Sequence, residues 1–414
     1  MTALQPVRGT QDLLPAEQRR HRHVAETARA IASRYGYAEI ATPIFEFTEV
    51  FSRPIGAATD IVQKEMYTFQ DRGGDEITLR PEYTAGIVRA VLSNGLTQSL
   101  PLKLFASGPM FRYERPQKGR FRQFHQIDIE LLGVAQPSGD VEVIALGADI
   151  LDALGVLAMT ELELNTLGDL ESRQSYRAAL VAYYEKRVDE LSEESRRRLE
   201  RNPLRILDSK EASDKRVNEE APLFDAYLTA DARKFFDAVR EGLERLGIAY
   251  RLSPRLVRGL DYYCHTAFEF VTQALGAQGT VLGGGRYDGL MGVMGGPETP
   301  GVGWAAGIER LALLVAEPPP DPRAIAIVPL GELAEAEAQK LAHALRRAGF
   351  VVDLGYSGNL RRRLSRADKI AARAAIIIGE DELARGAASL RDLDSGQQVE
   401  VPLASLQERL REFR

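Results

Sequence analysis

Polar and apolar side chains alternate along residues 124–131, and an apolar run over 102–110 lies a short distance before them. Strict alternation is typical of a half-buried strand, and two such segments joined by a loop predict a pair of neighbouring strands. Because strand side chains point alternately to opposite faces, we expect Gln126, Asp128 and Glu130 to share one face. This pair of strands is the centre of the predicted fold.

The segments around this pair predict helices mixed with short strands. Helices are expected where apolar residues recur every three or four positions, as at Val24, Ala28 and Ile31. The expected helices cover 16–35, 83–92, 139–154 and 308–316. The expected strands cover 37–51, 66–69, 76–79, 160–164, 255–270, 279–285 and 301–307. Since Pro43 cannot donate to a ladder, the strand over 37–51 is expected at an edge, a bulge or a subunit boundary.

Two changes of character divide the chain. Residues 170–249 are charge-rich and helix-periodic, and they predict a helical insertion inside an α/β domain. The proline-rich segment 318–322 predicts a stiff linker. Beyond it, strands and helices alternate, which predicts a small α/β domain with a mostly parallel core. The expected organisation is therefore a domain over 1–317, a linker, and a second domain over 323–414.

Composition narrows the class of protein. The 414 residues are 44% hydrophobic and 27% charged, with a net charge of −6, as in ordinary globular proteins. No run reaches 18 apolar residues, so we expect no membrane-spanning segment. The single cysteine, Cys264, excludes an internal disulfide and a cysteine-based zinc site and fits a reducing cytoplasm. The five histidines have no metal-ligand spacing. We expect a cytoplasmic protein without zinc.

The loop between the two central strands is strongly basic. It carries one acid, Glu114, and the cations Arg112, Arg115, Lys118, Arg120 and Arg122. Such a loop is either a solvated surface or a clamp for a polyanion. Phe121 and Phe124 lie among the cations, and an aromatic face there could stack a purine ring.

Other segments are open to two interpretations. Glu82 is either a helix N-terminal residue favoured by the dipole or, with Gln126 and Glu130, part of a polar pocket. Arg258, beside Tyr262 and Tyr263, is either a buried ion-pair partner or a site residue. The glycines of 283–289 allow the close approach of a ligand or of another strand. The GxGxxA match at 301–306 is not interpreted as a dinucleotide site, because no strand precedes it and the ribose-binding acid is missing.

These segments resemble those of bacterial histidyl-tRNA synthetases, a family of class II aminoacyl-tRNA synthetases. Residues 40–53 are similar to the first class II motif, which builds the dimer interface in the family. Residues 111–126 are similar to the second motif, and 301–311 to the third. Residues 256–263 and 283–287 resemble segments specific to the histidyl branch, and the region after Pro322 resembles the anticodon-binding domain.

The resemblance implies an antiparallel-sheet catalytic domain followed by an α/β anticodon-binding domain. It assigns histidine binding to Glu82, Tyr83, Thr84, Arg112, Gln126, Glu130, Arg258, Tyr262, Tyr263 and Tyr287. It assigns ATP binding to Arg112, Glu114, Arg120, Phe124 and Arg310. Arg112, Arg258 and Arg310 would carry catalysis by neutralising phosphate charge together with the Mg²⁺ that accompanies ATP. No protein side chain is assigned as a metal ligand.

The activity that the resemblance implies is histidine–tRNA ligation by a homodimer. L-histidine and ATP give histidyl-adenylate and pyrophosphate, and histidine then passes to the 3′-terminal adenosine of tRNA(His). The sequence names no general base for this transfer. A basic segment over 358–373, with six cations, is either a solvated helix face or a phosphate-binding face for tRNA.

Two alternatives share the same fold. One is the synthetase-like regulatory subunit of ATP phosphoribosyltransferase, a non-catalytic partner that lacks the anticodon-binding domain and the segment corresponding to 258–263. The other is an ATP-dependent amino-acid ligase that does not use tRNA. The chain has both the segment and a domain after Pro322, which argues against these alternatives.

Overall fold

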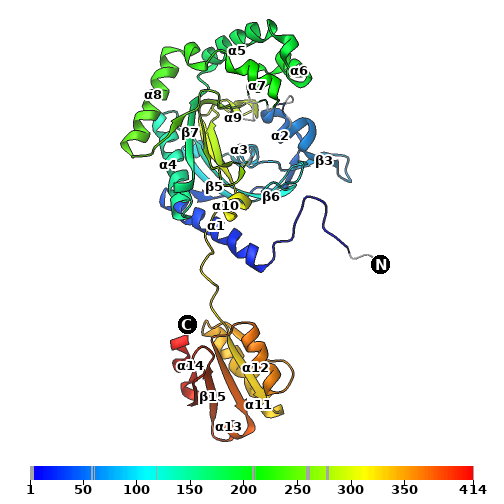
Figure 1. Cartoon of the computed structure of the whole chain (residues 1–414), viewed down its shortest axis with the longest axis vertical. Helices are drawn as coiled ribbons and strands as arrows, with labels where there is room; N and C mark the ends of the chain where they lie inside the picture. Colours follow the sequence, from blue (N-terminus) through cyan, green and yellow to red (C-terminus); the bar gives the residue numbers. More distant parts are fainter. Residues whose placement is uncertain are drawn as a thin grey trace. The chain divides into compact units, whose positions relative to one another are not determined.

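A computed structural model describes residues 4–413 apart from 57, 58, 60, 118, 208, 210, 258–261, 277 and 278, and describes residues 200 and 201 by their backbone alone. The chain divides into two compact units, with the boundary between Pro318 and Pro319 (Figure 1). Two residues singled out by the sequence, Arg258 and Lys118, lie outside the described residues.

The first unit is built on a sheet in which eight described strands are paired. At its centre, β5 (Leu102–Phe111) pairs antiparallel with β6 (Gln123–Leu132), which pairs antiparallel with β11 (Gly301–Gly307). The order continues through β10 (Thr280–Arg286), β9 (Cys264–Val271) and β7 (Glu161–Thr166), all antiparallel. Short parallel strands, β1 (Ala38–Glu39) and β8 (Arg251–Leu252), form the two edges. The expected antiparallel sheet is confirmed.

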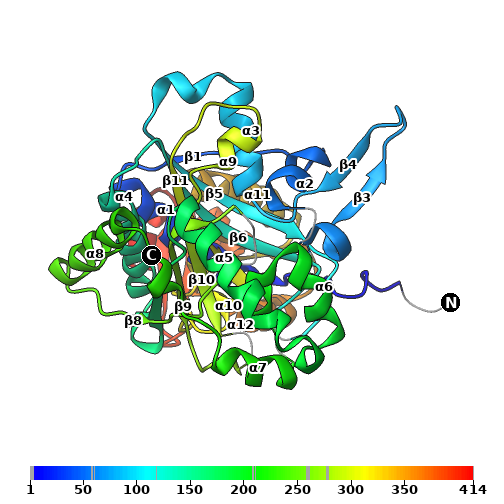
Figure 2. The same ribbon diagram turned by 90° about the horizontal axis from the view of Figure 1, so that it is seen from above.

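Helices cover both faces of this sheet, and the alternation along β6 decides which side chains meet them. α1 (Pro15–Arg34), α4 (Pro137–Ala153) and α8 (Ala230–Arg245) share one buried cluster with Ile127 and Ile129 of β6 (Figures 1 and 2). The other face packs on α3 (Thr84–Ser93) through Leu104 and Met110 of β5. Because neighbouring strand residues point to opposite faces, the polar residues of β6 lie on the α3 side.

The helical insertion has its own core. α5 (Leu170–Glu185), α6 (Glu193–Arg201) and α7 (Ala212–Glu219) form a group at the top of the first unit in Figure 1. Tyr176, Leu180, Tyr184 and Phe224 are buried in the cluster that joins them. α8 lies within the range 170–249 that the sequence predicts as an insertion. Its apolar face, however, packs in the main core and not in the core of the insertion. Helical periodicity identifies a helix, but not the surface that it covers.

The segment 37–51 is not the single strand that the sequence predicts. β1 ends at Glu39, β2 covers Phe45–Phe47, and α2 (Glu49–Ile55) follows. Pro43 lies between β1 and β2, where its missing N–H costs no ladder bond. β2 pairs with β4 (Glu76–Leu79), which pairs with β3 (Tyr67–Gln70) in a separate sheet. The β3–β4 hairpin projects from the edge of the unit (Figure 2).

The second unit is a five-stranded sheet with helices. β13 (Val352–Leu354), β12 (Ile325–Leu330) and β14 (Ala374–Gly379) are parallel, and the hairpin β15 (Ala387–Asp392) and β16 (Gln398–Pro402) completes the sheet. The helices are α11 (Glu332–Arg347), α12 (Leu360–Lys369), α13 (Glu380–Ala384) and α14 (Leu406–Arg409). Across the described part of the chain, no helix has the length and apolar character needed to cross a bilayer.

Candidate active site

β6 places a row of polar side chains on the α3 side of the sheet. Gln126, Asp128 and Glu130 are 9%, 1% and 1% exposed, and the first two line an open cavity. Gln126 Oε1 and Asp128 Oδ2 have no hydrogen-bond partner among the described residues. Buried acceptors are nearly always satisfied in folded proteins. This wall of the cavity is therefore suited to a ligand that brings hydrogen-bond donors.

Glu130 is held between two hydroxyl groups. Thr84 Oγ1 donates to Oε1 of Glu130 at 2.5 Å, and the Tyr287 hydroxyl donates to Oε2. Burial raises the pKa of Glu130 to about 8, although the two hydroxyls act in the opposite direction. β11 passes so close that a Cβ at Gly303 would overlap the Glu130 carboxylate. Glycine at 303 therefore provides the space in which this acid lies.

Glu82 caps α3 and also faces the cavity. Its Oε2 accepts the N–H of Thr84 at 2.7 Å, and its Oε1 accepts the N–H of Ala85 at 2.9 Å. These bonds satisfy donors that a helix N-terminus leaves without partners. Burial raises the pKa of Glu82 against the effect of these bonds and of Arg112. Both interpretations of Glu82 hold, because the side chain that caps the helix also lines the cavity.

Three tyrosines form an aromatic cluster beside Glu130. The ring centroids of Tyr262 and Tyr263 are 4.8 Å apart, and Tyr287 meets Tyr262 edge-on at 5.7 Å. The strand predicted over 255–270 begins only at Cys264. Tyr262 and Tyr263 precede the strand, so their side chains need not point to opposite faces of the sheet. Both line the cavity.

Tyr83 shares a buried core with Tyr263 and Tyr287 but is not among the described residues that line the cavity, in contrast to the histidine-binding role expected for it. The guanidinium of Arg80 lies 4.2 Å from the centroid of its ring, and its hydroxyl lies where a Cβ on Gly108 would fall. Tyr83 is 2% exposed and packs on β5, away from the cavity lining. Glu82 and Thr84 on either side of it turn toward the cavity instead.

Three arginines, Arg112, Arg120 and Arg310, converge elsewhere in the cavity lining. Arg112 Nε donates to the carbonyl of Pro81 at 2.8 Å, and its guanidinium lies 5.3 Å from the ring centroid of Phe124. Arg310 Nη1 donates to the carbonyl of Thr280 at 2.6 Å. Backbone carbonyls thus fix two of these side chains in place.

The positive charges of these arginines exceed the negative charge beside them. Burial lowers the pKa of Arg310, and the neighbouring charges of Arg120 and Arg112 lower it further. Glu114 offsets part of this charge, with Oε2 at 2.6 Å from Arg120 Nε and Oε1 at 4.0 Å from Arg112 Nη1. Clustered guanidinium groups suit a phosphate, which accepts several charge-assisted bonds. The geometry favours the anion-clamp interpretation for Arg112 and Arg120.

The other cations of the basic loop differ from these. Arg122 Nη1 donates to the carbonyl of Arg8 at 3.2 Å, and its backbone N–H donates to Gly9 at 2.7 Å. Its guanidinium lies 3.8 Å from the ring centroid of Tyr113. Arg122 therefore holds the N-terminal segment against the loop, whereas Arg115 is exposed.

The glycine-rich motif over 283–287 serves mainly the packing of β10. Arg286 is fully buried, and its Nε lies 3.2 and 3.1 Å from the two carboxylate oxygens of Asp140 on α4. A Cβ at Gly284 would overlap the backbone of β11. In this motif Tyr287 is the side chain that contacts the acids of the site.

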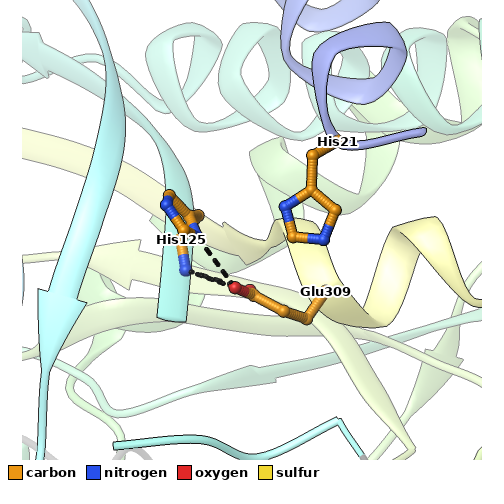
Figure 3. A group of neighbouring side chains, drawn as sticks. All are labelled: His21, His125 and Glu309. Atoms are coloured by element: carbon orange, nitrogen blue, oxygen red, sulfur yellow. Dashed lines mark hydrogen bonds and ion pairs between the residues drawn. The ribbon is translucent and has the colours of Figure 1, made fainter. Parts of the chain in front are cut away.

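Sequence patterns left two features of this region unassigned. Asp128 lines the cavity without a role in the family resemblance, and burial together with Glu130 and Glu82 raises its pKa well above the usual range. The second feature is a cluster of His21, His125 and Glu309 (Figure 3). These residues are too far apart in sequence to form a spacing motif. The one signal was the position of His21, three residues before Val24 on the apolar face of α1.

Comparisons with known proteins agree with this geometry. A family model described as "Histidyl-tRNA synthetase" matches residues 9–311, and one described as "Anticodon binding domain" matches 324–413. The histidine–tRNA ligase of Rhodospirillum rubrum is 60% identical over 414 residues, which is 100% of each chain. That of Gluconacetobacter diazotrophicus is 58% identical over 403 residues, or 97% of each chain.

Solved structures extend the similarity to the fold. The crystal structure of apo S. aureus histidyl-tRNA synthetase matches with a TM-score of 0.84 and 34% identity, covering 98% of this chain and 99% of that one. A Bacillus halodurans protein titled an ATP phosphoribosyltransferase regulatory subunit/histidyl-tRNA synthetase shares the fold at 21% identity, with a TM-score of 0.66 over 92% of this chain and 99% of that one.

The antiparallel sheet and its cavity of acids and arginines, taken with these matches, define a class II aminoacyl-tRNA synthetase. The chain belongs to the histidyl-tRNA synthetase family.

Proposed function

We propose that this protein joins L-histidine to tRNA(His) at the expense of ATP. The observation that carries the proposal is one cavity lined both by buried acceptors that have no partner among the described residues and by converging arginines. Histidine brings an ammonium group and a ring that both donates and accepts hydrogen bonds. Gln126, Glu130 and Glu82 suit these donors. An amino acid without the ring nitrogens would leave buried groups unpaired, which gives strong discrimination.

In the first step, the histidine carboxylate attacks the α-phosphorus of ATP in line, and pyrophosphate leaves. The protein supplies no nucleophile, so its work is to position the substrates and to neutralise charge. Arg112 and Arg310 bind the phosphates, and Phe124 stacks on the adenine. Mg²⁺ arrives as part of the MgATP substrate. By family resemblance, Arg258 lies next to the α-phosphate and the amino-acid carboxylate.

In the second step, a hydroxyl of the terminal adenosine attacks the carbonyl of the adenylate. A phosphate oxygen of the adenylate is the proposed acceptor of its proton. The second unit binds the tRNA, and α12 supplies a basic face. Arg363 does not belong to that face, because it is 6% exposed and donates to Glu335 at 2.7 Å. Arg361, Arg362 and Lys369 are exposed and can contact phosphates.

The regulatory-subunit alternative is not favoured, because the anticodon-binding model matches and the identity to named ligases extends over the full length.

Exposed aromatic side chains on β2 and β3 support the proposal that the protein is a homodimer. Phe45, Phe47 and Phe69 are 56%, 58% and 47% exposed, and such patches often mark protein interfaces. A tRNA substrate and the free thiol of Cys264 both support a cytoplasmic location for this protein.

Purified full-length protein should catalyse histidine-dependent exchange of pyrophosphate into ATP and should charge tRNA(His). No exchange at saturating histidine would contradict the enzymatic proposal. Exchange without charging would instead favour an amino-acid ligase that does not use tRNA.

A further inference from the structure

His21, His125 and Glu309 come from three elements that are distant in the sequence. His21 is on α1, His125 is on β6, and Glu309 is in the first turn of α10 (Ile308–Ala312). One ligand atom of each side chain lies within 4.8 Å of the other two (Figure 3). The rings of the two histidines meet edge to face, with centroids 5.6 Å apart, and the Glu309 carboxylate lies beside both.

The hydrogen bonds of this cluster leave one buried donor or acceptor atom unused. Glu309 accepts the backbone N–H of His125 at 2.9 Å and lies 2.9 Å from its Nδ1. His21 is 8% exposed, and its Nδ1 has no partner among the described residues. Packing against Val24 and the rest of the α1 face would be served as well by an apolar side chain. An imidazole that is buried without a partner points to a ligand.

We propose that His21, His125 and Glu309 bind one divalent transition-metal ion of the zinc class. Two imidazoles and one carboxylate are a ligand set typical of zinc with a position left for water. Zinc–ligand distances of about 2.0–2.2 Å place neighbouring ligand atoms about 3.4 Å apart in a tetrahedron. The ligand atoms lie within 4.8 Å of one another, so side-chain shifts of about 1.4 Å or less bring them to this spacing. Mg²⁺ is not expected to bind, because it prefers oxygen ligands.

The ion has a route to the cluster beside the ATP cavity. A second hollow, lined by Leu13, Arg20, His21, Phe121 and Glu309, opens next to it. Glu309 also lines the ATP cavity and precedes Arg310, while His125 follows Phe124. An ion at this position would tie α1 to the two segments that carry the proposed ATP contacts. Binding itself requires neither histidine nor ATP, so it can be tested apart from the proposed function.

The test uses untagged full-length protein that has been dialysed against a chelator. Titration with Co²⁺ should produce d–d absorption bands of a low-coordinate site, and one equivalent of Zn²⁺ should abolish them. His21→Ala should weaken the binding of both ions by at least about tenfold. His23→Ala, two residues further along α1, is the matched control and should bind like the parent protein.

Metal-free thermal unfolding and circular dichroism establish that each variant is folded. Glu309→Gln provides a second variant, which should also weaken Co²⁺ binding and alter its absorption bands. The proposal is overturned if the parent protein takes up no stoichiometric Co²⁺ or Zn²⁺. It is also overturned if folded His21→Ala binds these ions as tightly as His23→Ala does.

Discussion

The hydroxyl of Thr84 donates a 2.5 Å hydrogen bond to Oε1 of Glu130 and so joins the first turn of α3 to β6. The backbone N–H of the same threonine donates to Glu82 at 2.7 Å. One residue thus fixes two buried acids that are 48 positions apart in the sequence. Among the described residues, no basic side chain lies within hydrogen-bonding distance of either acid, so positive charge from a ligand is the natural complement to this pair.

Thr84→Val should weaken histidine binding while ATP binding is preserved. The substitution keeps the shape of the side chain but leaves Glu130 with one fewer donor. Leaving a buried acceptor without its donor costs about 1–3 kcal/mol, so the KM for histidine should rise about 5- to 150-fold in pyrophosphate exchange. Thr160→Val, whose hydroxyl donates to Leu157 within its own turn, is the control. Equal increases in the KM for both substrates would argue against a specific role for Thr84.

Glu130→Gln should change how stability depends on pH. The pKa of Glu130 is raised to about 8 in the folded protein, whereas a free glutamate titrates near about 4.3. The folded state therefore holds a proton that the unfolded chain releases, and this contribution to stability is lost as pH rises from about 4.3 to about 8. The variant should gain stability relative to the parent protein over this interval, by roughly 5 kcal/mol at most.

Trp304, the single tryptophan, is buried in the first unit, and its fluorescence during urea unfolding reports the stability of that unit. A difference between variant and parent that stays constant from about pH 5 to about pH 8.5 would contradict the raised pKa of Glu130.

Arg310→Gln should impair the use of ATP. Its guanidinium is partly buried near Arg112 and Arg120, and removing it lowers the positive charge available to the phosphates. Loss of one preorganised charge-stabilising group typically costs about 10²- to 10³-fold in rate, so kcat/KM for ATP in pyrophosphate exchange should fall by this factor. Arg115→Ala removes an exposed cation of the basic loop between β5 and β6 and should change little. A similar loss in both variants would argue for a general effect of loop charge.

Local sequence patterns predicted the features of the site that depend on neighbouring residues. Alternation over 124–131 gave both β6 and the shared face of Gln126, Asp128 and Glu130, because the period of a strand is fixed by its backbone. The orientation of the Tyr83 side chain could not be predicted from such a local pattern. It depends on Arg80 and Gly108, and no local pattern encodes which of three successive side chains turns toward a cavity.

Long-range packing explains the remaining differences. The sequence predicts that α8 belongs to the helical insertion, but its residues Phe236 and Val239 pack in the core of the main sheet. The partners of His21 lie 104 and 288 positions further along the chain, at His125 and Glu309. Periodicity and motif spacing operate within a few tens of residues, so neither can reveal a cluster that only the folded topology assembles.

Arg286→Ala should strongly destabilise the first unit. The substitution leaves the carboxylate of Asp140 buried without its partner, and breaking a buried pair in this way costs about 3–5 kcal/mol. The midpoint of urea unfolding, followed by Trp304 fluorescence, should fall accordingly. Arg53→Ala removes an exposed pair with Glu49 and should cost about 0.5 kcal/mol or less. If the two variants lose similar stability, the buried pair does not have the structural role inferred for it.

Removal of the second unit should separate the two steps of the reaction. Every described residue that contacts the proposed histidine and ATP positions lies before Pro318, and each unit has a hydrophobic core of its own. A protein ending at Pro318 should therefore fold and retain most of its histidine-dependent pyrophosphate exchange. It should lose most of its ability to charge tRNA(His), because the region that matches the anticodon-binding model, 324–413, is gone.

The matched comparison is full-length protein with Arg361→Ala and Arg362→Ala, in which the second unit stays folded while two exposed cations of α12 are removed. Its charging should weaken, and the dependence of tRNA affinity on salt should become shallower, since fewer counterions are released on binding. Full charging by the truncated protein would place tRNA recognition in the first unit instead.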